Sequence, residues 1–517
     1  MNPLLNRIGI VTEPLSLPIL QATTREIDPV DALLFADPAD PLAWTRKGDG
    51  LVAAGPDLLH IDVAEEGRIA ALADLWRALS QAAEVDDEVR VPGTGLIGFG
   101  TFAFDDASER PSTLIVPSAL VGWRGGRAWL TRIRVADTPA QLAEPAPVDL
   151  GGAWSATLGP GAMDPPAHEA AVRRALAVIE AGTAEKIVIA RDLVGTVPAG
   201  ADLRRLVRSL ATDYPDTWTF AVDGLIGASP ETLVTVRDGA VSARVLAGTH
   251  ARGAGLHEDQ LVSSELRAST KNSAEHRFAV DSVLDTLRPH ASDLRAADEP
   301  FALELPNLWH LATDVSGTLS DGASALDLVR AMHPTAAVAG TPTHRAIEEI
   351  RRIEPFDRGR YAGPVGWIDG DGDGEWAIAL RSAQFDPLEP AATTRTVSAH
   401  AGGGIVRGSV PDAELDETQP AHIGVPAASL REHARREVSR DDLRAAARER
   451  RGRTAGAGRE VEDPFARLRI NRVRRRATPD GVESEGHRDV RQVVALGDLV
   501  EHPADGARIL VEVGALR

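Results

Sequence analysis

Short apolar runs separated by turns fill much of the first 160 residues and predict β-strands there. Three such runs lie at residues 51–55, 95–102 and 112–116, with Gly-, Pro- and Asp-containing stretches between them. One helix is expected in this region, over residues 69–84. The pattern therefore predicts an N-terminal half built mainly from strands.

A second half begins after the Gly- and Pro-rich stretch 160–166. It opens with an expected amphipathic helix over 168–181, whose apolar residues recur on one face. Further strands are expected at 186–194, 217–222, 232–236, 241–246, 363–368 and 376–383, and further helices at 256–287, 324–332 and 343–353. Strands outnumber helices, without βαβ alternation or a phosphate-binding glycine motif. We therefore expect an α+β fold with antiparallel sheets in two pseudo-halves flanked by helices.

The charge pattern changes near residue 426. Residues 427–517 contain 20 Arg, no Lys and 16 acidic residues, a net charge of +4, whereas the first 426 residues carry −24. The tail has one aromatic residue and little apolar area to offset the entropy of ordering. We expect an N-terminal half of the catalytic unit at 1–160, a catalytic half at 161–426, and a poorly structured tail at 427–517 with short strands near 493–496 and 509–511.

Composition excludes several classes of protein. The 517 residues include no cysteine, which excludes disulfides, a thiol nucleophile and thiolate metal sites. No apolar run approaches the ~18 residues of a membrane helix, and the first residues do not resemble a signal peptide. We therefore expect a cytoplasmic protein without a membrane partner. A net charge of −20 argues against a nucleic-acid partner.

A lysine and a glutamate are candidates for acid–base chemistry. Lysine is rare, occurring only at 47, 186 and 271, and Lys186 opens the apolar strand candidate 186–194. Glu231 follows a tight turn at the start of another strand. Burial in general lowers the pKa of a lysine and raises that of a glutamate, so one enclosed pocket can supply both a base and an acid. Taken alone, a chance surface lysine is an equally good interpretation of Lys186, and a capping or solvated loop carboxylate is the better interpretation of Glu231.

Three further glutamates are candidates for a metal site. Glu275 lies on the long helix expected at 256–287, beside a packed apolar stripe. Glu414 and Glu417 are three positions apart and so share one face of a short helix. Carboxylates from two helices suit Mg²⁺, which takes few protein ligands and an anionic substrate. Any one of them alone is more typical of a solvated helix surface.

These segments together resemble the chorismate-utilising enzymes, the superfamily of isochorismate, anthranilate, aminodeoxychorismate and salicylate synthases. The likeness runs from about residue 45 to Thr418. The motifs that carry it are Lys186–Arg191, Ser229–Glu231, Leu246–Thr249, Glu275–His276, Trp309–Leu311, His333–Ala337, Arg358–Trp367, Ala379–Arg381 and Glu417–Thr418. The amino-acid sequence at 306–311 and 372–376 is most similar to that of actinobacterial isochorismate synthases of the menaquinone pathway.

The resemblance implies an anthranilate synthase component I-like fold and an isochorismate synthase. It implies that Lys186 activates water for attack on C2 of chorismate and that Glu231 protonates the departing C4 hydroxyl. Mg²⁺ would be held by Glu275 and Glu417, with Glu414 acting through water. The implied substrate contacts are Gly248, Thr249, His310, Ala337, Tyr361, Arg381 and Gly402.

The resemblance also separates the rival activities. Ala247 stands where aminodeoxychorismate synthases place a nucleophilic lysine, and Lys186 favours water over ammonia, so no glutaminase subunit is expected. Salicylate synthase, which shares base and acid but also eliminates pyruvate, remains an alternative. The other alternative is a catalytically impaired chorismate-binding protein.

The chain departs from the family after Thr418. Ala421 stands where a lysine normally helps to bind the substrate carboxylate, and Pro420 would end the helix that carries the metal ligands. Asn272 replaces a commonly acidic residue. A change of reading frame in a GC-rich gene is our hypothesis for the tail.

Overall fold

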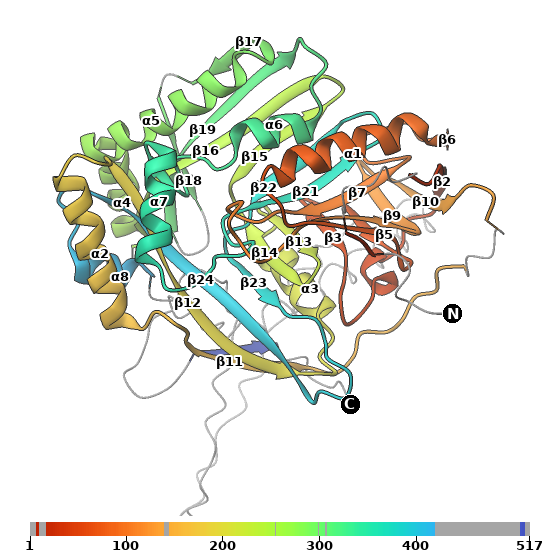
Figure 1. The fold of residues 1–517 in the computed structure, drawn as a ribbon, viewed down its shortest axis with the longest axis horizontal. Coiled ribbons are helices and arrows are strands. Elements are labelled where there is room, and N and C mark those ends of the chain that lie inside the picture. Colours follow the sequence, from red (N-terminus) through yellow and green to blue (C-terminus); the bar gives the residue numbers. More distant parts are fainter. Residues whose placement is uncertain are drawn as a thin grey trace, which may run out of the picture. The chain divides into compact units, whose positions relative to one another are not determined.

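The structure is a computed structural model, and it describes residues 7–9, 17–138, 144–253, 255–297, 299–304, 308–418 and 507–511 (Figure 1). All of these residues belong to one compact unit. The predicted tail at 427–517 therefore lies outside the described residues, except for 507–511. Ala421 and Pro420 also lie outside them.

The first sheet has 11 strands among the described residues and carries several expected site residues. Its strand order is β1 (Arg7–Gly9), β5 (Asp57–Val63), β8 (Ser112–Pro117), β7 (Ile97–Thr101), β21 (Pro364–Asp369), β22 (Gly374–Ile378), β15 (Thr232–Arg237), β16 (Ala240–Ala251), β19 (Leu308–Leu319) and β17 (Ala291–Ala296), with β18 (Phe301–Glu304) also paired to β19. All of its pairs are antiparallel except β1 with β5. Strands from before and after residue 160 meet where β7 pairs with β21.

The second sheet has 14 strands among the described residues. Its order is β25 (Ala507–Val511), β11 (Trp154–Pro160), β12 (Lys186–Pro198), β24 (Thr394–Val406), β23 (Ser382–Phe385), β14 (Leu225–Ser229), β13 (Trp218–Val222), β3 (Ala43–Arg46), β4 (Asp49–Ala53), β9 (Ala119–Arg124), β10 (Arg127–Val135), β2 (Leu20–Ile27) and β6 (Glu84–Asp87), with β20 (Gly340–Thr341) also paired to β12. The two halves of the sequence meet again where β13 pairs with β3. Each sheet is therefore assembled from both halves.

Helices pack on both sheets. Those described are α1 (Arg68–Ala82), α2 (Pro165–Glu180), α3 (Arg204–Asp213), α4 (Leu256–Ala268), α5 (Thr270–Leu287), α6 (Ala325–Met332), α7 (Thr343–Ile353) and α8 (Pro411–Thr418), with a short 3-10 helix at Ala32–Phe35. Figure 1 shows α5 and α6 along the first sheet and α2 and α7 beside β12, and both arrangements are supported by direct contacts. None of the helices in this part of the chain is long and apolar enough to cross a membrane.

Local sequence explains where several helices begin. The side chain of Asp164 accepts a hydrogen bond from the backbone N–H of Ala167, with proline at the first helical positions of α2. Ser324 and Asp327 form a reciprocal capping box at the start of α6. The expected helices at 69–84, 168–181, 324–332 and 343–353 are thus confirmed with small shifts of their ends.

One predicted helix and one predicted strand are each divided into two elements in the structure. The helix predicted over 256–287 is two helices, because Ser269 is extended (φ −69°, ψ 113°) and its carbonyl accepts the first backbone bond of α5 from Ser273. Serine is a favoured residue at such a helix start. The strand predicted over 376–383 is β22 and β23, which belong to different sheets. The chain turns between them, where Arg381 has φ +50°.

A buried carboxylate, that of Glu375, accepts hydrogen bonds from tryptophan side chains of the core. Trp44, Trp129, Trp367 and Trp376 are all almost fully buried. Glu375 lies among them and accepts hydrogen bonds from the indole N–H groups of Trp44 (2.8 Å) and Trp367 (3.1 Å) and from Arg124 (2.8 Å). These hydrogen bonds compensate for the loss of water around the buried carboxylate, which would otherwise be costly.

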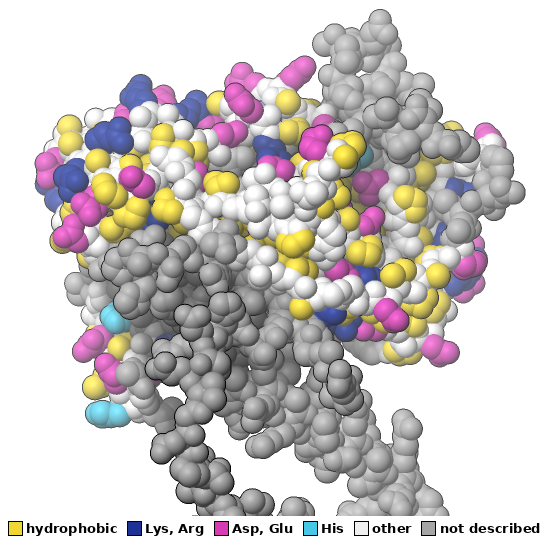
Figure 2. Space-filling model, turned by 90° about the horizontal axis from the view of Figure 1, so that it is seen from below, with side chains coloured by type: hydrophobic (Ala, Val, Ile, Leu, Met, Phe, Trp, Pro, Cys, Tyr) yellow, Lys and Arg dark blue, Asp and Glu magenta, His cyan; other side chains and the backbone are white. Residues whose placement is uncertain are grey.

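The surface carries mixed charge. On the face drawn in Figure 2, acidic and basic side chains are interspersed, and the described residues form no extended basic patch there.

Candidate active site

Lys186 lies at the start of β12, as the sequence predicts. In the backbone register it faces Thr341 of β20 on one side and Val406 of β24 on the other. Residues 187–193, which follow it, are all buried, and Lys186 itself is half-buried. A long strand with neighbours at both edges thus fixes the backbone that carries this amine.

Glu231 lies between β14 and β15 and is 7% exposed. Its backbone N–H donates to Ser229 Oγ at 3.2 Å, and its carbonyl accepts from Ile378 at 3.2 Å. Burial raises the pKa of Glu231 to about 7, and the positive charge of Lys186 opposes that rise. The fold therefore brings the two candidate acid–base residues within electrostatic reach of each other.

Tyr361 lies on a tight turn beside Glu231. The turn includes Gly359 at φ +55° and Ala362 at φ +62°, and Tyr361 is 8% exposed. Burial raises the pKa of the Tyr361 hydroxyl to about 12, and the carboxylate of Glu231 adds to the rise. Its ring stacks on that of His400, with centroids 4.9 Å apart and planes 19° apart. Tyr361 is therefore a buried, neutral hydroxyl within electrostatic reach of Glu231.

His310 and Arg381, which are 71 residues apart, meet at the site. Arg381 Nη2 donates to His310 Nε2 at 3.1 Å. Burial and, to a smaller extent, the charge of Arg381 lower the pKa of His310 to about 3, so the imidazole is a neutral acceptor. Thr249 faces His310 in the register of β16 and β19 next to an irregularity after Leu246, and Gly248 has φ +83°. The structure thus places Gly248, Thr249, His310 and Arg381 near one another, and their contact with substrate stays a prediction.

Ala337 and Gly402 approach the site from two other elements. Ala337 and Glu231 line the same small cavity of about 20 Å³, together with Thr335 and residues of β16 and α5. Gly402 lies on β24 directly opposite Ala190 of β12. A Cβ atom at residue 402 would lie 2.8 Å from the carbonyl oxygen of Ile189, so the close approach of the two strands requires glycine there.

The three expected metal ligands are placed only in part. Glu414 lies on α8 and is 9% exposed, and α8 packs on α2 and β24. Glu275 lies on α5 and Glu417 on α8, but their side chains are outside the described part of the structure. Among the described side chains no group of three acidic or histidine residues could hold a metal ion. The metal site therefore stays a prediction.

His276 fixes α5 against the site. Its Nδ1 donates to the carbonyl of Ala247 at 3.2 Å, and its Nε2 accepts from Thr313 Oγ1 at 2.8 Å. Residue 275, next to it on α5, is thereby held near the 246–249 segment. In the sequence, His276 belongs to the Glu275–His276 motif and precedes the apolar stripe of α5, which is the pattern that could have indicated a buried histidine.

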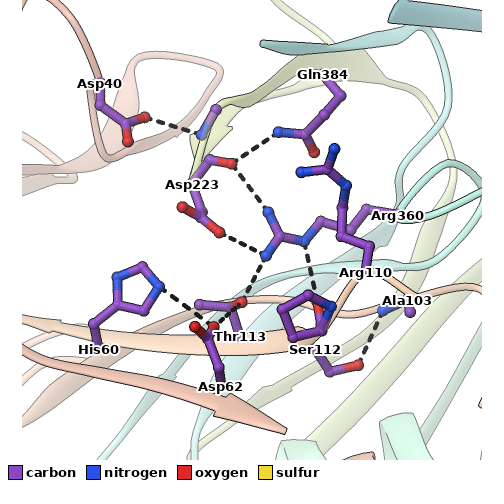
Figure 3. Close-up of polar contacts among 12 residues, drawn as sticks. Asp40, His60, Asp62, Ala103, Arg110, Ser112, Thr113, Asp223, Arg360 and Gln384 are labelled. Carbon is purple, nitrogen blue, oxygen red and sulfur yellow. Dashed lines mark hydrogen bonds and ion pairs between the residues drawn. The ribbon is translucent and has the colours of Figure 1, made fainter. Parts of the chain in front are cut away.

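A polar network anchors the turn that carries Tyr361 (Figure 3). Arg360 donates to Thr113 Oγ1 at 2.6 Å and to the carbonyl of Asp223 at 3.0 Å, and it also forms an ion pair with the Asp223 carboxylate. Burial alone would raise the pKa of Asp223, but the charge of Arg360 lowers it. The network ties the turn to β8 and to the β13–β14 turn. The sequence does not predict this network, because the residues that form it are distant along the chain.

The raised pKa of Glu231 predicts that stability depends on pH. The folded protein keeps a proton on Glu231 up to about pH 7, whereas the unfolded chain loses it near the ordinary value of 4.5. Between these values the folded state binds more protons, so the free energy of unfolding falls as pH rises. Glu231→Gln removes this loss and is expected to stabilise the protein above neutral pH by up to about 3 kcal/mol.

Thermal denaturation at about pH 5 and about pH 8 measures this difference. Glu180→Gln, which alters an exposed carboxylate on α2, is the control and should change neither midpoint. A stabilisation by Glu231→Gln that is the same at both pH values would contradict the raised pKa.

Comparison with known proteins shows which family this chain belongs to. The family model described as "Chorismate binding enzyme" matches residues 153–420. Isochorismate synthase DhbC of Bacillus subtilis is 40% identical over 267 residues, covering 49% of this chain and 65% of the relative. A Mycobacterium tuberculosis protein with the provisional name isochorismate synthase MenF is 36% identical over 342 residues, covering 63% of this chain and 84% of the relative.

A solved structure agrees with the fold. The menaquinone-specific isochorismate synthase MenF from Escherichia coli aligns with a TM-score of 0.61 at 23% identity, covering 77% of this chain and 91% of that one. At this identity the likeness shows the fold alone. The expected α+β fold with antiparallel sheets and flanking helices is confirmed.

Proposed function

This chain belongs to the chorismate binding enzyme family, and from that premise we propose that it is an isochorismate synthase. The observation that carries the proposal is that buried Glu231, whose pKa is raised to about 7, lies within electrostatic reach of Lys186. An amine can act as the general base that takes a proton from water. A carboxylic acid that keeps its proton near neutral pH can act as the general acid that protonates a leaving hydroxyl. The names of the relatives support the same activity.

The proposed reaction is an isomerisation with a balanced exchange of water. Lys186, once its ammonium has given up a proton, accepts a proton from water as the water oxygen attacks C2 of chorismate. The ring double bond shifts, and the C4 hydroxyl departs with the proton of Glu231 as a new water molecule. Base and acid recover their starting states once Lys186 returns its proton and Glu231 regains one.

The remaining site residues would orient the substrate. Arg381 supplies a cation and Tyr361 a neutral hydroxyl for one carboxylate of chorismate. The backbone of Gly248, Thr249 and Gly402 would close around the ring. His310 would hold Arg381 in place through its neutral Nε2, and Ala337 would leave room above the ring.

The residues fit Mg²⁺ by their chemistry. Glu275, Glu414 and Glu417 are carboxylates on two helices that pack near the site, and Glu414 is buried, as a metal-bound carboxylate is. When bound, Mg²⁺ would supply positive charge that neutralises the substrate carboxylate. Glu275 and Glu417 would hold it directly and Glu414 through water.

Isochorismate synthase is favoured over its alternatives. Relatives with 40% and 36% identity are named isochorismate synthases, not salicylate synthases. Ala247 is 9% exposed in the strand next to the site, and as alanine it offers no amine nucleophile. We propose that the product serves menaquinone synthesis, in line with the likeness to the Mycobacterium tuberculosis protein named MenF.

The purified full-length chain should convert chorismate to isochorismate only when Mg²⁺ is present. Chromatography of the product tests this, and EDTA should stop turnover. Glu275→Gln and Glu417→Gln should each raise the half-saturating Mg²⁺ concentration about tenfold or more, because each removes a charged ligand from a cation with few protein contacts. Turnover that EDTA does not affect would refute the metal assignment.

Asp281→Asn is the matched control for the metal variants. Asp281 lies exposed on α5, the same helix as Glu275. Its neutralisation removes a charge of the same sign without removing an expected ligand. The control should leave the Mg²⁺ requirement unchanged. If Asp281→Asn raises the requirement as much as the glutamate variants do, the effect comes from a general loss of negative charge and not from the loss of a metal ligand.

A further inference from the structure

One edge of β12 lacks a strand neighbour just beyond Lys186. β24 pairs with β12 along its whole length on the other side. On this side β20 covers Lys186 and Ile187, and β11 covers residues 193–196. Between them, among the described residues, no strand pairs with the chain, although these positions are buried. Buried backbone groups without partners would be costly, so something else must satisfy them.

Two side chains close this gap. Glu354 Oε1 accepts from the backbone N–H of Ala190 at 2.8 Å. Arg358 Nη2 donates to the carbonyl of Val188 at 2.9 Å. The N–H of Val188 itself donates to the carbonyl of Ala339 at 2.9 Å. An ion pair thus takes the place of a strand at the edge of β12.

The same ion pair extends to the loop that carries Ala337. Arg358 Nε and Nη2 donate to Glu354 at 2.8 and 2.6 Å, and Nη1 donates to the carbonyl of Val338 at 3.0 Å. The side chains of Arg358 and Glu354 are 2% and 1% exposed. The backbone N–H of Tyr361 donates to the carbonyl of Arg358 at 3.0 Å. One buried pair therefore joins the strand of Lys186, the loop of Ala337 and the turn of Tyr361.

We propose that Glu354 and Arg358 are positioning residues for the reaction at Lys186. The inference rests on the proposed function. The pair fixes β12 relative to the 333–339 loop and the 358–363 turn, so that amine, hydroxyl and loop converge on one substrate. Neither side chain needs to touch the substrate for this role.

The chemistry of the pair suits positioning better than stability alone. A buried ion pair is often no more stabilising than well-packed apolar residues of similar volume. Apolar residues at 354 and 358, however, would leave the N–H of Ala190 and the carbonyls of Val188 and Val338 without partners. The planar, fixed donors of arginine also define direction in a way that a lysine ammonium does not.

Arg358→Lys tests the proposal. A lysine keeps the charge but cannot reach Glu354, Val188 and Val338 together, so β12 and the loop lose their fixed relation. We expect kcat for chorismate turnover to fall about 10- to 100-fold, because a misplacement of about 1 Å in an active site has effects of this size. The half-saturating Mg²⁺ concentration should not change.

Arg204→Lys is the matched control. Arg204 also forms a buried ion pair, with Asp202, and donates to the carbonyls of Leu34, Val148 and Asp149. It therefore shares burial, charge and backbone contacts with Arg358 but belongs to α3, away from Lys186. Both variants should lose thermal stability, whereas Arg204→Lys should keep kcat within about twofold at temperatures where it is folded.

Glu354→Gln provides a second, milder variant. It keeps an oxygen acceptor for the N–H of Ala190 but weakens the bond to Arg358. Amide hydrogen exchange of the wild type and Glu354→Gln should show faster exchange at Ala190 in the variant, together with a lower kcat. If Arg358→Lys does not fold, these two measurements still test whether the ion pair positions β12 for the reaction.

The outcomes separate the inference from the proposed function. A wild-type protein that does not turn over chorismate overturns the proposed function, and the inference, which rests on it, falls too. An active wild type with kcat unchanged in Arg358→Lys and Glu354→Gln overturns the inference alone. So does an Arg204→Lys variant that loses as much kcat as Arg358→Lys, since the effect would then be one of general stability.

Discussion

Replacing Lys186 with alanine is expected to lower kcat for chorismate about 10²- to 10⁴-fold while changing KM by less than about threefold. The reason is that a general base acts on the water proton in the transition state and contributes little to ground-state binding. Lys186 lies at the start of β12, within electrostatic reach of buried Glu231. Steady-state kinetics, with calorimetry of chorismate binding, measure the two quantities separately.

Two further variants sharpen this result. Lys186→Arg keeps the positive charge but cannot act as a base, because an arginine in a protein does not lose its proton, and it should be as inactive as Lys186→Ala. Lys47→Ala is the control, since the Lys47 side chain is 61% exposed and pairs with Asp216 at the surface. Near-normal turnover by Lys186→Ala would overturn the assignment of the base.

Glu231→Gln is the second variant with a large expected effect. Gln has no carboxylic proton to deliver to the departing hydroxyl, so kcat should fall about 10²- to 10⁴-fold. In the wild type, burial raises the pKa of Glu231 to about 7, so the acid form is present below that pH and is lost above it. The kcat of the wild type should therefore decline as pH rises through about 7.

The pH profile and the variant test the same proton in different ways. Glu231→Asp keeps a carboxylic acid on a shorter side chain, and it should retain part of the activity and the alkaline decline. Glu180→Gln, at the exposed end of α2, should leave the profile unchanged. A wild-type kcat that stays constant well above neutral pH would show that Glu231 is not the acid.

Local pattern was sufficient for most of the fold. The strands at 112–116 and 232–236 and the helix at 343–353 are found almost as expected, because their apolar runs and helical periodicity are local properties. The break at Ser269 was missed because the apolar stripe continues across it. The separation of β22 from β23 was missed because sheet membership depends on distant partners, such as Gly227 for Ser382.

The site was predicted as a set of motifs rather than as a geometry. Glu231 lies within electrostatic reach of Lys186, and His310 accepts a hydrogen bond from Arg381. The sequence offered no means of finding the contacts of Arg358 with Val188 and Val338, since backbone acceptors carry no sequence signal. Only the Glu354–Arg358 spacing of four residues hinted at an ion pair.

Turnover of chorismate in water enriched in oxygen-18 tests whether a water molecule supplies the new hydroxyl at C2. If water activated by Lys186 attacks C2 and the C4 hydroxyl departs with the proton of Glu231, the wild-type protein with Mg²⁺ must form isochorismate that carries one heavy oxygen, located at C2. Mass spectrometry of the product, with nuclear magnetic resonance to place the label, reads the result. Isochorismate without the label, or a product that has lost pyruvate or gained nitrogen, would contradict the account.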